Sequence, residues 1–290
     1  NPSLSIIYKL NYTWRFTAHA SYKERYGEMT DLYDRPYQTD YRNSVWNCGI
    51  LPVYRQQLYS VYGEYKNTAR EFFATVNLTH NREWYNRIYE QRIENGQVQR
   101  VSLPLSNHGS GYTVKSTLSK GFYDLGLKTS FLALLNISKA EQISGGQRLP
   151  YQYRLMRLEP KVIWTPNRHW ETSYQTDIRY GGNKIGERTR LAPLWNVTQQ
   201  VQLSYIFSPI EASLSVDHYH NDVNEDQSVN AVFADFSVSW KSGRWQITAT
   251  ATNLFDKRTY AYTRYASLES YTSWVRIRPR EFLVAIRYRL

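Results

Sequence analysis

The stretch FLVAIRYRL, residues 282–290, carries the pattern that decides the fold. Phe282, Val284, Ile286, Tyr288 and Leu290 place an apolar side chain at every second position, and two of the four intervening positions are arginines. Successive side chains of a β-strand point to opposite faces of its sheet, so this run predicts a strand with one unbroken apolar face. A face of this kind suits a strand that borders an apolar medium.

The same alternation recurs along the whole chain. It is clearest over residues 14–23, 72–79, 112–118, 197–207 and 232–241. These runs last ~10 residues or more, which suits tilted transmembrane strands better than the ~5 to 6 residues of ordinary strands. No segment shows a competing helical period. We therefore expect an all-β protein built from antiparallel strands.

The connections between these runs alternate between short and long. Short turns are expected near residues 11–13, 67–69, 119–123, 165–168, 208–209 and 241–243, and long, polar, aromatic-rich loops near residues 26–53, 83–109, 140–150, 181–192, 221–227 and 265–271. Tight turns at one rim and long loops at the other are typical of an up-and-down transmembrane β-barrel. The runs number about thirteen, and we interpret residues 1–290 as part of one such barrel domain.

The composition agrees with this interpretation. Tyr, Trp and Phe number 26, 9 and 10, and together they make up 16% of the chain. Tyr and Trp favour places where one end of the ring is apolar and the other end is wet, as in the aromatic girdles at the two interfaces of a membrane. Mean hydropathy is −0.62, and no window approaches the ~18 to 20 apolar residues of a transmembrane helix. A single cysteine, Cys48, excludes an internal disulfide.

The net charge of +11 is spread over the whole chain. Without a recognition helix or a zinc finger to accompany it, this charge does not predict binding to nucleic acid. No signal peptide opens the sequence at Asn1, and an exported barrel must carry one. We therefore expect the chain to begin inside a longer protein.

The last fifty residues resemble a known family. The segment NLFDKRTY, residues 253–260, resembles a segment on the penultimate strand of TonB-dependent receptors of the bacterial outer membrane. Residues 278–280, RPR, stand where that family has an Arg-containing approach to its last strand. The run 282–290 resembles the signal by which outer-membrane barrels are recognised and inserted, although Leu290 stands where Phe is common.

The resemblance implies the rest of the architecture. Members of the family have a 22-stranded barrel around an N-terminal plug, so this chain corresponds to about the last thirteen strands, without the plug and its TonB-contacting segment. The implied function is high-affinity uptake of a scarce nutrient: a ferric chelate, a glycan, a peptide or a cobalamin-like ligand. The implied partners are outer-membrane lipid and lipopolysaccharide, the missing plug and strands, TonB through that plug, the barrel-assembly machinery and the nutrient. The alternative is a passive porin-like or adhesin-type barrel.

Two of the long loops combine aromatic rings with guanidinium groups. The candidate ligand-binding residues are Tyr33, Arg35, Tyr37, Tyr41, Arg42 and Trp46 in the first loop and Trp84, Tyr85 and Arg87 in the second, beside Tyr89. Such a combination could hold a sugar, an aromatic chelate or a peptide. The competing interpretation is that the loops pack on their own aromatics and contact lipopolysaccharide phosphates.

No catalytic residue, metal site or cofactor is predicted. Ser215, Asp217 and His218 lie on one strand, and adjacent residues of a strand point to opposite faces, so the three cannot form a catalytic triad. His218 and His220 share a face, but His218 continues the lipid-facing set. Expected lumen-facing positions are more often basic than acidic, for example Lys115 and Arg179. This charge favours either an anionic cargo or pairing with the plug.

Overall fold

The computed structural model describes residues 1–94, 97–186, 189–190, 193–224, 226–265 and 270–289, and Leu290 lies outside them. Strands dominate this part of the chain. Its helical elements are two single turns, η1 (Met29–Leu32) and η2 (Tyr123–Leu125). No helix within these ranges is long and apolar enough to cross a membrane.

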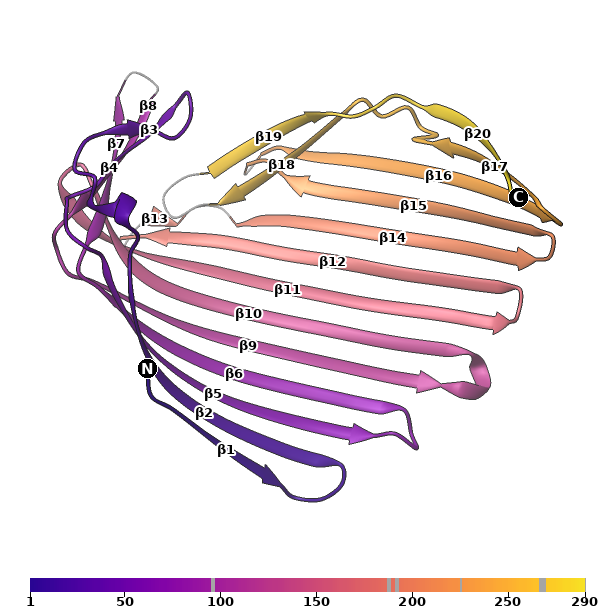
Figure 1. Cartoon of the computed structure of the whole chain (residues 1–290), viewed down its shortest axis with the longest axis horizontal. Coiled ribbons are helices and arrows are strands. Elements are labelled where there is room, and N and C mark those ends of the chain that lie inside the picture. The colour runs from indigo at the N-terminus through magenta and orange to yellow at the C-terminus, as the bar shows by residue number, and fades with distance from the viewer. Residues whose placement is uncertain (95–96, 187–188, 191–192, 225, 266–269, 290) are drawn as a thin grey trace.

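One series of strands forms the body of the molecule (Figure 1). In spatial order these strands are β1 (Ser3–Lys9), β2 (Trp14–Tyr26), β5 (Val53–Asn67), β6 (Phe72–Tyr85), β9 (Asn107–Phe122), β10 (Leu127–Ser144), β11 (Gln147–Asn167), β12 (Trp170–Ile185), β14 (Leu194–Phe207), β15 (Ile210–Asp222), β16 (Ser228–Ser242), β17 (Trp245–Thr252) and β20 (Glu281–Tyr288). Each pairs antiparallel with the next. The predicted all-β, antiparallel, up-and-down architecture is confirmed.

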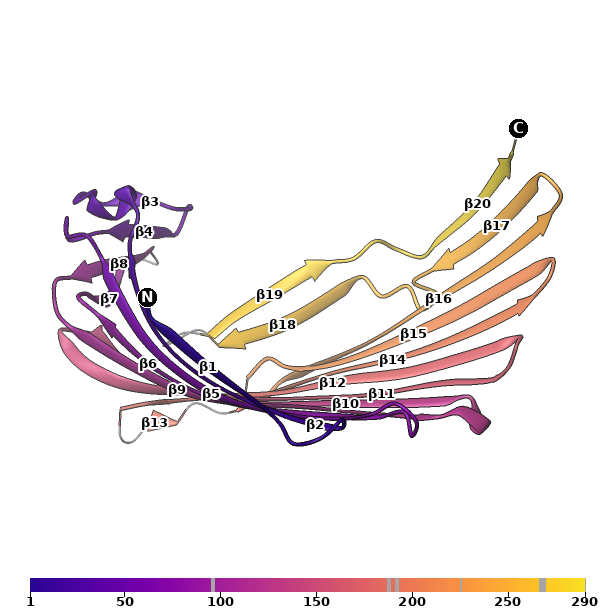
Figure 2. The same ribbon diagram turned by 60° about the horizontal axis from the view of Figure 1, so that its bottom comes forward.

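The sheet curves strongly and forms an open trough. Figure 2 shows its two ends rising on the same side. In the described part of the chain, β1 pairs with β2 alone and β20 pairs with β17 alone, so no pairing closes the trough into a barrel. The twenty-two strands and the plug implied by the family resemblance stay predictions.

Short and long connections lie at opposite ends of the strands, as expected (Figure 1). The prediction of a long loop at residues 140–150 is wrong, because β10 and β11 stay paired out to Ser144 and Gln147. Only Gly145 and Gly146 connect the two strands, with φ of 57° and 75°. Glycine adopts positive φ without steric cost, which permits a two-residue hairpin turn.

The segment NLFDKR interrupts the strand that was expected to continue to Tyr260. Strand β17 ends at Thr252, and Asn253 has φ of 50°. The side chain of Asn253 accepts a hydrogen bond from the Lys257 amide and donates to the carbonyls of Lys257 and Arg278, at 3.0, 2.8 and 2.9 Å. The chain then forms a separate hairpin, β18 (Thr259–Tyr265) and β19 (Ser270–Arg276), on the concave side of the trough (Figure 2).

The convex face of the sheet is apolar from strand to strand. Directly paired residues share a face, and one such row reads Ile6, Ala18, Val61, Leu78, Val114, Leu135, Met156, Tyr180 and Trp195. Of these, Ile6, Val61 and Leu78 are 58%, 54% and 49% exposed. Val284 and Ile286 on β20 belong to the same face and are 65% exposed. So large an exposed apolar face marks a surface that contacts lipid or another protein.

Aromatic side chains border this apolar face at both ends. Beside the tight turns, the ring of Trp170 lies tilted against that of Tyr205 with ring centroids 4.6 Å apart, and at the opposite end Tyr180 meets Trp195 edge to face at 4.8 Å. The ten residue-to-residue steps from Trp170 to Tyr180 span roughly 33 Å of strand, which a tilt of about 45° reduces to a height of about 23 Å. An apolar band of about 25 Å between aromatic girdles is the dimension of an outer-membrane barrel.

Candidate functional site

The two longest loops are tied together at the loop-bearing end of the trough. They contain β3 (Tyr37–Gln38), β4 (Asn43–Trp46), β7 (Ile88–Glu94) and β8 (Gln97–Leu103), here called the loop sheet. Strand β4 pairs with β8, β8 with β7, and β7 with the last residues of β10. Ile88, Val101 and Ile143 are buried where the loop sheet joins the trough. The loops are therefore anchored to the trough by backbone pairing and by packed side chains (Figure 2).

A cavity of about 680 Å³ lies between the loop sheet and the concave face of the trough, and we call it the vestibule. Its polar and aromatic lining residues are Thr39, Asn43, Ser44, Tyr85, Arg87, Tyr89, Gln91, Arg100, Asn107, Glu141, Gln142 and Tyr151. Pockets for small molecules typically measure about 300–1,000 Å³ and combine aromatic walls with a few polar groups. The vestibule therefore has the size and the lining of a small-molecule site.

Two guanidinium groups contact one tyrosine ring in the vestibule. The guanidinium carbon of Arg100 lies 3.7 Å from the ring centroid of Tyr89, and that of Arg87 lies 5.0 Å from it. Burial raises the pKa of Tyr89 above its ordinary value, against the opposing effect of the two arginines. At neutral pH the phenol therefore stays protonated and can donate a hydrogen bond to an anion.

An ion pair holds Arg87 in place and joins the two loops. Its guanidinium lies 2.9 Å from the Asp31 carboxylate in η1, and both side chains are mostly buried. Burial alone would raise the pKa of Asp31, but the hydrogen bonds from Arg87 and the Glu28 amide, with the Arg87 charge, lower it. A carboxyl group whose pKa is lowered in the folded state stabilises that state at pH values above the group's ordinary pKa. This stabilisation is lost as the pH falls through the lowered pKa.

Glu83 organises the tyrosines at the edge of the vestibule. Its carboxylate accepts hydrogen bonds from the phenols of Tyr85 and Tyr54 at 2.8 and 3.0 Å. It also accepts bonds from Asn81 at 2.8 Å and Gln56 at 3.1 Å. Four donors on one carboxylate fix the orientation of Tyr85, whose ring lies 5.0 Å from that of Tyr54.

Two of the candidate residues from the sequence, Tyr85 and Arg87, line the vestibule. Trp84 lies on the opposite, convex face, because it alternates with Tyr85 along β6. The first-loop candidates Tyr33, Arg35, Tyr37, Tyr41, Arg42 and Trp46 are all exposed. Their ligand-binding role stays a prediction.

The first-loop aromatics make contacts within their own loop. The rings of Tyr33 and Tyr37 meet edge to face at 6.0 Å, and the Arg42 guanidinium lies 5.4 Å from the Tyr41 ring. The indole of Trp46 donates a hydrogen bond of 2.8 Å to the Asp34 carbonyl. These contacts agree with a loop that packs on its own aromatics, the competing interpretation from the sequence.

Sequence reasoning missed Arg100 and Tyr151 as vestibule residues. Tyr151 could have been found, because it continues the concave-facing alternation of Tyr153, Leu155 and Arg157 along β11. Arg100 could not be assigned to the vestibule, because the vestibule itself depends on the parallel pairings of β8 with β4 and of β7 with β10.

Deeper in the trough, carboxylates of the sheet itself pair with several bases of the concave face. Arg157 and Arg179 lie 2.9 and 2.6 Å from the Asp177 carboxylate, and Arg15 lies 3.1 Å from Glu64. Part of the positive charge expected in the lumen is therefore neutralised within the chain.

The two histidines considered as metal ligands lie on the convex face, paired with Val197 and Gln199 of β14. His220 contacts Asn230 at 2.8 Å and Asp222 at 3.3 Å. Within the described ranges, no group of three or more His, Cys, Asp or Glu side chains could hold a metal ion.

Solved structures of outer-membrane proteins are similar to this chain. The ferric yersiniabactin uptake receptor FyuA from Yersinia pestis gives a TM-score of 0.51 at 7% identity, over 99% of this chain and 49% of that receptor. FpvA from P. aeruginosa, solved in complex with pyoverdine, gives 0.49 at 10% identity, over 98% of this chain and 43% of FpvA. The siderophore receptor PirA from Acinetobacter baumannii gives a TM-score of 0.44 at 8% identity, over 86% of this chain and 51% of PirA.

The chain thus spans about half the length of these structures. No protein-family model matches the sequence, and no curated protein matches it. At 7% identity the likeness to FyuA is one of fold alone. The chain has the antiparallel, up-and-down fold of an outer-membrane β-barrel protein.

Proposed function

We propose that this chain is the C-terminal part of the barrel of a TonB-coupled outer-membrane importer, and that the vestibule receives its nutrient. The observation that carries the proposal is the position of the vestibule. It lies on the concave side, at the loop-bearing end of a sheet whose convex face has the height of a membrane. A solute that arrives from the loop side meets this cavity before it enters the lumen.

The lining favours an anionic ligand with flat or polarisable groups. Arg100 supplies positive charge beside Arg87, whose guanidinium is paired with Asp31. The phenols of Tyr89 and Tyr151 supply hydrogen-bond donors, and the ring of Tyr85, whose hydroxyl is bonded to Glu83, supplies a stacking face. The one carboxylate in the lining, Glu141, is engaged by Arg148 at 2.9 Å. A ferric chelate with anionic oxygen donors and aromatic groups fits this chemistry best.

We expect that Arg100→Gln, made in the complete gene product, weakens binding of a ferric chelate by roughly ten- to a hundredfold. Loss of one charge-assisted hydrogen bond costs about 1.5–3 kcal/mol. Arg87→Gln should weaken binding at least as much, because it also releases Asp31. The measurement is equilibrium binding of radiolabelled chelate to whole cells, with uptake followed in the presence and absence of TonB.

The matched control is Arg25→Gln near the loop-bearing end of β2, which removes the same charge at an exposed residue outside the vestibule lining. This variant should bind the chelate as the wild type does. If the Arg100 and Arg25 variants bind equally well, the vestibule is not the site. Uptake that proceeds without TonB would instead identify a passive, porin-like barrel.

A further inference from the structure

Glu90 is the one buried charged side chain in the part of the chain that the structure describes, with 7% of its surface exposed. It lies on β7 between Tyr89 and Gln91, which line the vestibule, but Glu90 itself is not part of the lining. Neighbouring residues of a strand face opposite ways, so Glu90 points away from the cavity, as the buried Ile88 does. A buried carboxylate costs free energy unless it is paired and hydrogen-bonded, so its partners show what it does there.

Both carboxylate oxygens of Glu90 have partners. One accepts hydrogen bonds from the guanidinium of Arg92 on the same strand, at 2.9 Å from Nε and 2.7 Å from Nη2. The other accepts a hydrogen bond of 3.2 Å from the backbone amide of Gly146, which is 56 positions away in the chain. Gly146 belongs to the two-residue turn that joins β10 to β11. The carboxylate therefore ties the loop sheet to the tip of a trough hairpin.

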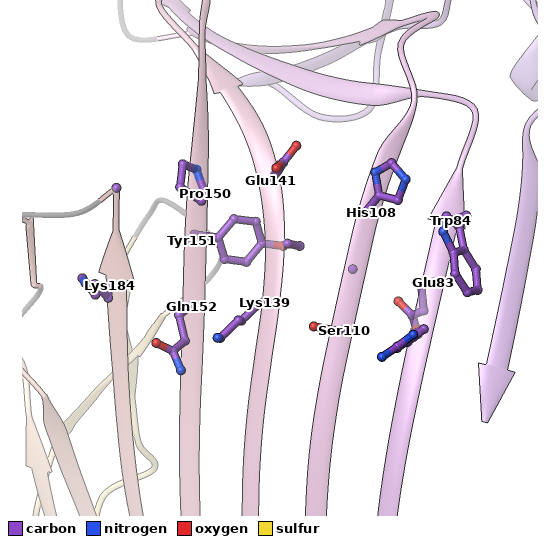
Figure 3. A pocket seen from close by; sticks show the side chains of 14 residues that line it. Glu83, Trp84, His108, Ser110, Lys139, Glu141, Pro150, Tyr151, Gln152 and Lys184 are labelled. Atoms are coloured by element: carbon purple, nitrogen blue, oxygen red, sulfur yellow. The ribbon is translucent and has the colours of Figure 1, made fainter. Parts of the chain in front are cut away.

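The vestibule lies between two walls that belong to different parts of the fold. Arg87, Tyr89 and Arg100 belong to the loop sheet, and we call them the near wall. Gln142 of β10 and Tyr151 of β11 belong to the trough, and we call them the far wall. Figure 3 shows Tyr151 near the loop-bearing end of its strand. A ligand that touches both walls binds well only when their separation is fixed.

The backbone ladder between the two walls is short. Strand β7 pairs with β10 at two residue pairs, Glu90 with Ile143 and Gln91 with Ser144. A hydrogen bond of 3.3 Å between the side chains of Gln91 and Gln142 adds to them. So short a ladder leaves the loop sheet free to rotate against the trough unless a further contact lies beyond it. The bond from Glu90 to the turn amide supplies this contact.

We propose that Glu90 is a positioning residue, which fixes the separation of the near and far walls through its hydrogen bond to the Gly146 amide. The consequence for uptake rests on the proposed function, because the walls matter only if the vestibule receives the nutrient. The two proposals can fail separately. Arg100→Gln tests whether the vestibule binds the ligand, whereas the separation of the walls can be measured without any ligand.

The separation is measured by pulsed electron paramagnetic resonance between two nitroxide labels in the complete protein, reconstituted in bilayers. Gln97 on β8 and Arg154 on β11 are both exposed, and their labels report the loop sheet and the trough. Cys48→Ser, with any cysteine outside these 290 residues also replaced, provides the background. Each variant is compared with the same doubly labelled protein that retains Glu90.

Two substitutions of Glu90 and one control separate the possible causes. Glu90→Ala removes both bonds, whereas Glu90→Gln keeps an oxygen that can accept from the Gly146 amide. The control is Glu24→Ala on β2, which removes a carboxylate from an ion pair of 3.0 Å with Arg55, outside the vestibule lining. We expect Glu90→Ala to broaden the distribution of distances between the labels. Glu90→Gln and Glu24→Ala should keep the distribution of the parent protein.

The affinity for a bulky ligand should follow the separation of the walls. The probes are the ferric complex of dihydroxybenzoate, as the ligand that fills the cavity, and free dihydroxybenzoate, as a fragment that touches one wall. Apparent affinity falls with the fraction of molecules that are competent to bind, and a charge-assisted hydrogen bond changes such an equilibrium by roughly tenfold. Glu90→Ala should therefore bind the ferric complex roughly tenfold more weakly and the fragment as before, while Glu90→Gln restores binding of the complex.

Three results would overturn the proposal. An unchanged distance distribution in Glu90→Ala would show that Glu90 does not hold the walls. Equal broadening in Glu90→Gln would show that the bond to the Gly146 amide is not what holds them. Equal weakening of the complex and the fragment in Glu90→Ala would show a general loss of loop structure instead of a change in the separation of the walls.

Discussion

Val284→Arg is expected to abolish or strongly reduce the amount of folded protein in the outer membrane. Val284 lies on the convex face of β20, opposite Ala249, and four residues from the girdle residue Tyr288. Four residues of tilted strand place it roughly 9 Å above that girdle, near the middle of the apolar band. An arginine at the bilayer midplane costs about 2–4 kcal/mol in a barrel of this kind. The amount of heat-modifiable protein in isolated outer membranes measures the effect.

The neighbouring residue gives a matched control. Leu283 pairs with Thr250, so it faces the concave side, and it is as exposed as Val284. Leu283→Arg introduces the same side chain into the same strand but directs it toward water. The Leu283 variant should therefore assemble close to wild-type levels. Equal losses for the two variants would show that β20 does not distinguish a lipid face from a wet face.

Asn253→Ala is expected to release the β18–β19 hairpin from the trough. Asn253 is 7% exposed, and its side chain makes the three hydrogen bonds that fix the junction after β17. Loss of three such bonds costs roughly 2–4 kcal/mol, and the change adds up to about 1 kcal/mol because alanine tolerates positive φ less well than asparagine does. Hydrogen exchange over residues 259–265 and 270–276 should accelerate accordingly, while exchange in β10 and β11 stays slow.

A second substitution at this position separates the two causes. Asn253→Gly loses the same hydrogen bonds but accepts φ of 50° without strain, so it should be less destabilising than Asn253→Ala. If neither variant accelerates exchange in the hairpin, the NLFDKR segment does not hold the junction. Its resemblance to the receptor family would then have no structural basis in these bonds.

The strands and their facing could be predicted because both depend on local patterns. Alternation assigned Val284, Ile286 and Tyr288 to one face of the last strand, and direct pairing places all three on the convex face. The same alternation places Trp84 and Tyr85 on opposite faces of β6. The sequence analysis had grouped these two residues as one ligand-binding cluster because they are neighbours in the chain. Strand parity therefore assigns residues to faces more reliably than proximity along the chain.

The vestibule could not be predicted, because it depends on pairings between separate loops. The β7–β8 hairpin places Arg100 beside Tyr89, but the vestibule around them forms only when β8 has also paired with β4 and β7 with β10, and no local period encodes a parallel contact of this kind. The end of β17 was missed for a different reason. An Asn at positive φ ends the strand through side-chain bonds to residues four and twenty-five positions away, and only the first of these is local.

The central claim is that the convex face contacts lipid and the concave face contacts water. It can be tested at two adjacent residues in the middle of β14. Val201 pairs with Tyr174 on the convex face, and Gln202 pairs with Ser173 on the concave face. Cys48 is the only cysteine of these 290 residues, so a Cys48→Ser background, with any cysteine outside them also replaced, allows one nitroxide spin label at either position in the complete protein.

The measurement is the accessibility of each label to oxygen and to a water-soluble nickel chelate in reconstituted bilayers. Val201 lies between the girdle residues Trp195 and Tyr205. Its label should therefore collide with oxygen and be shielded from the chelate, while the label at Gln202 should favour the chelate. Equal preference for the chelate at both positions, or a preference for oxygen at Gln202, would contradict the account.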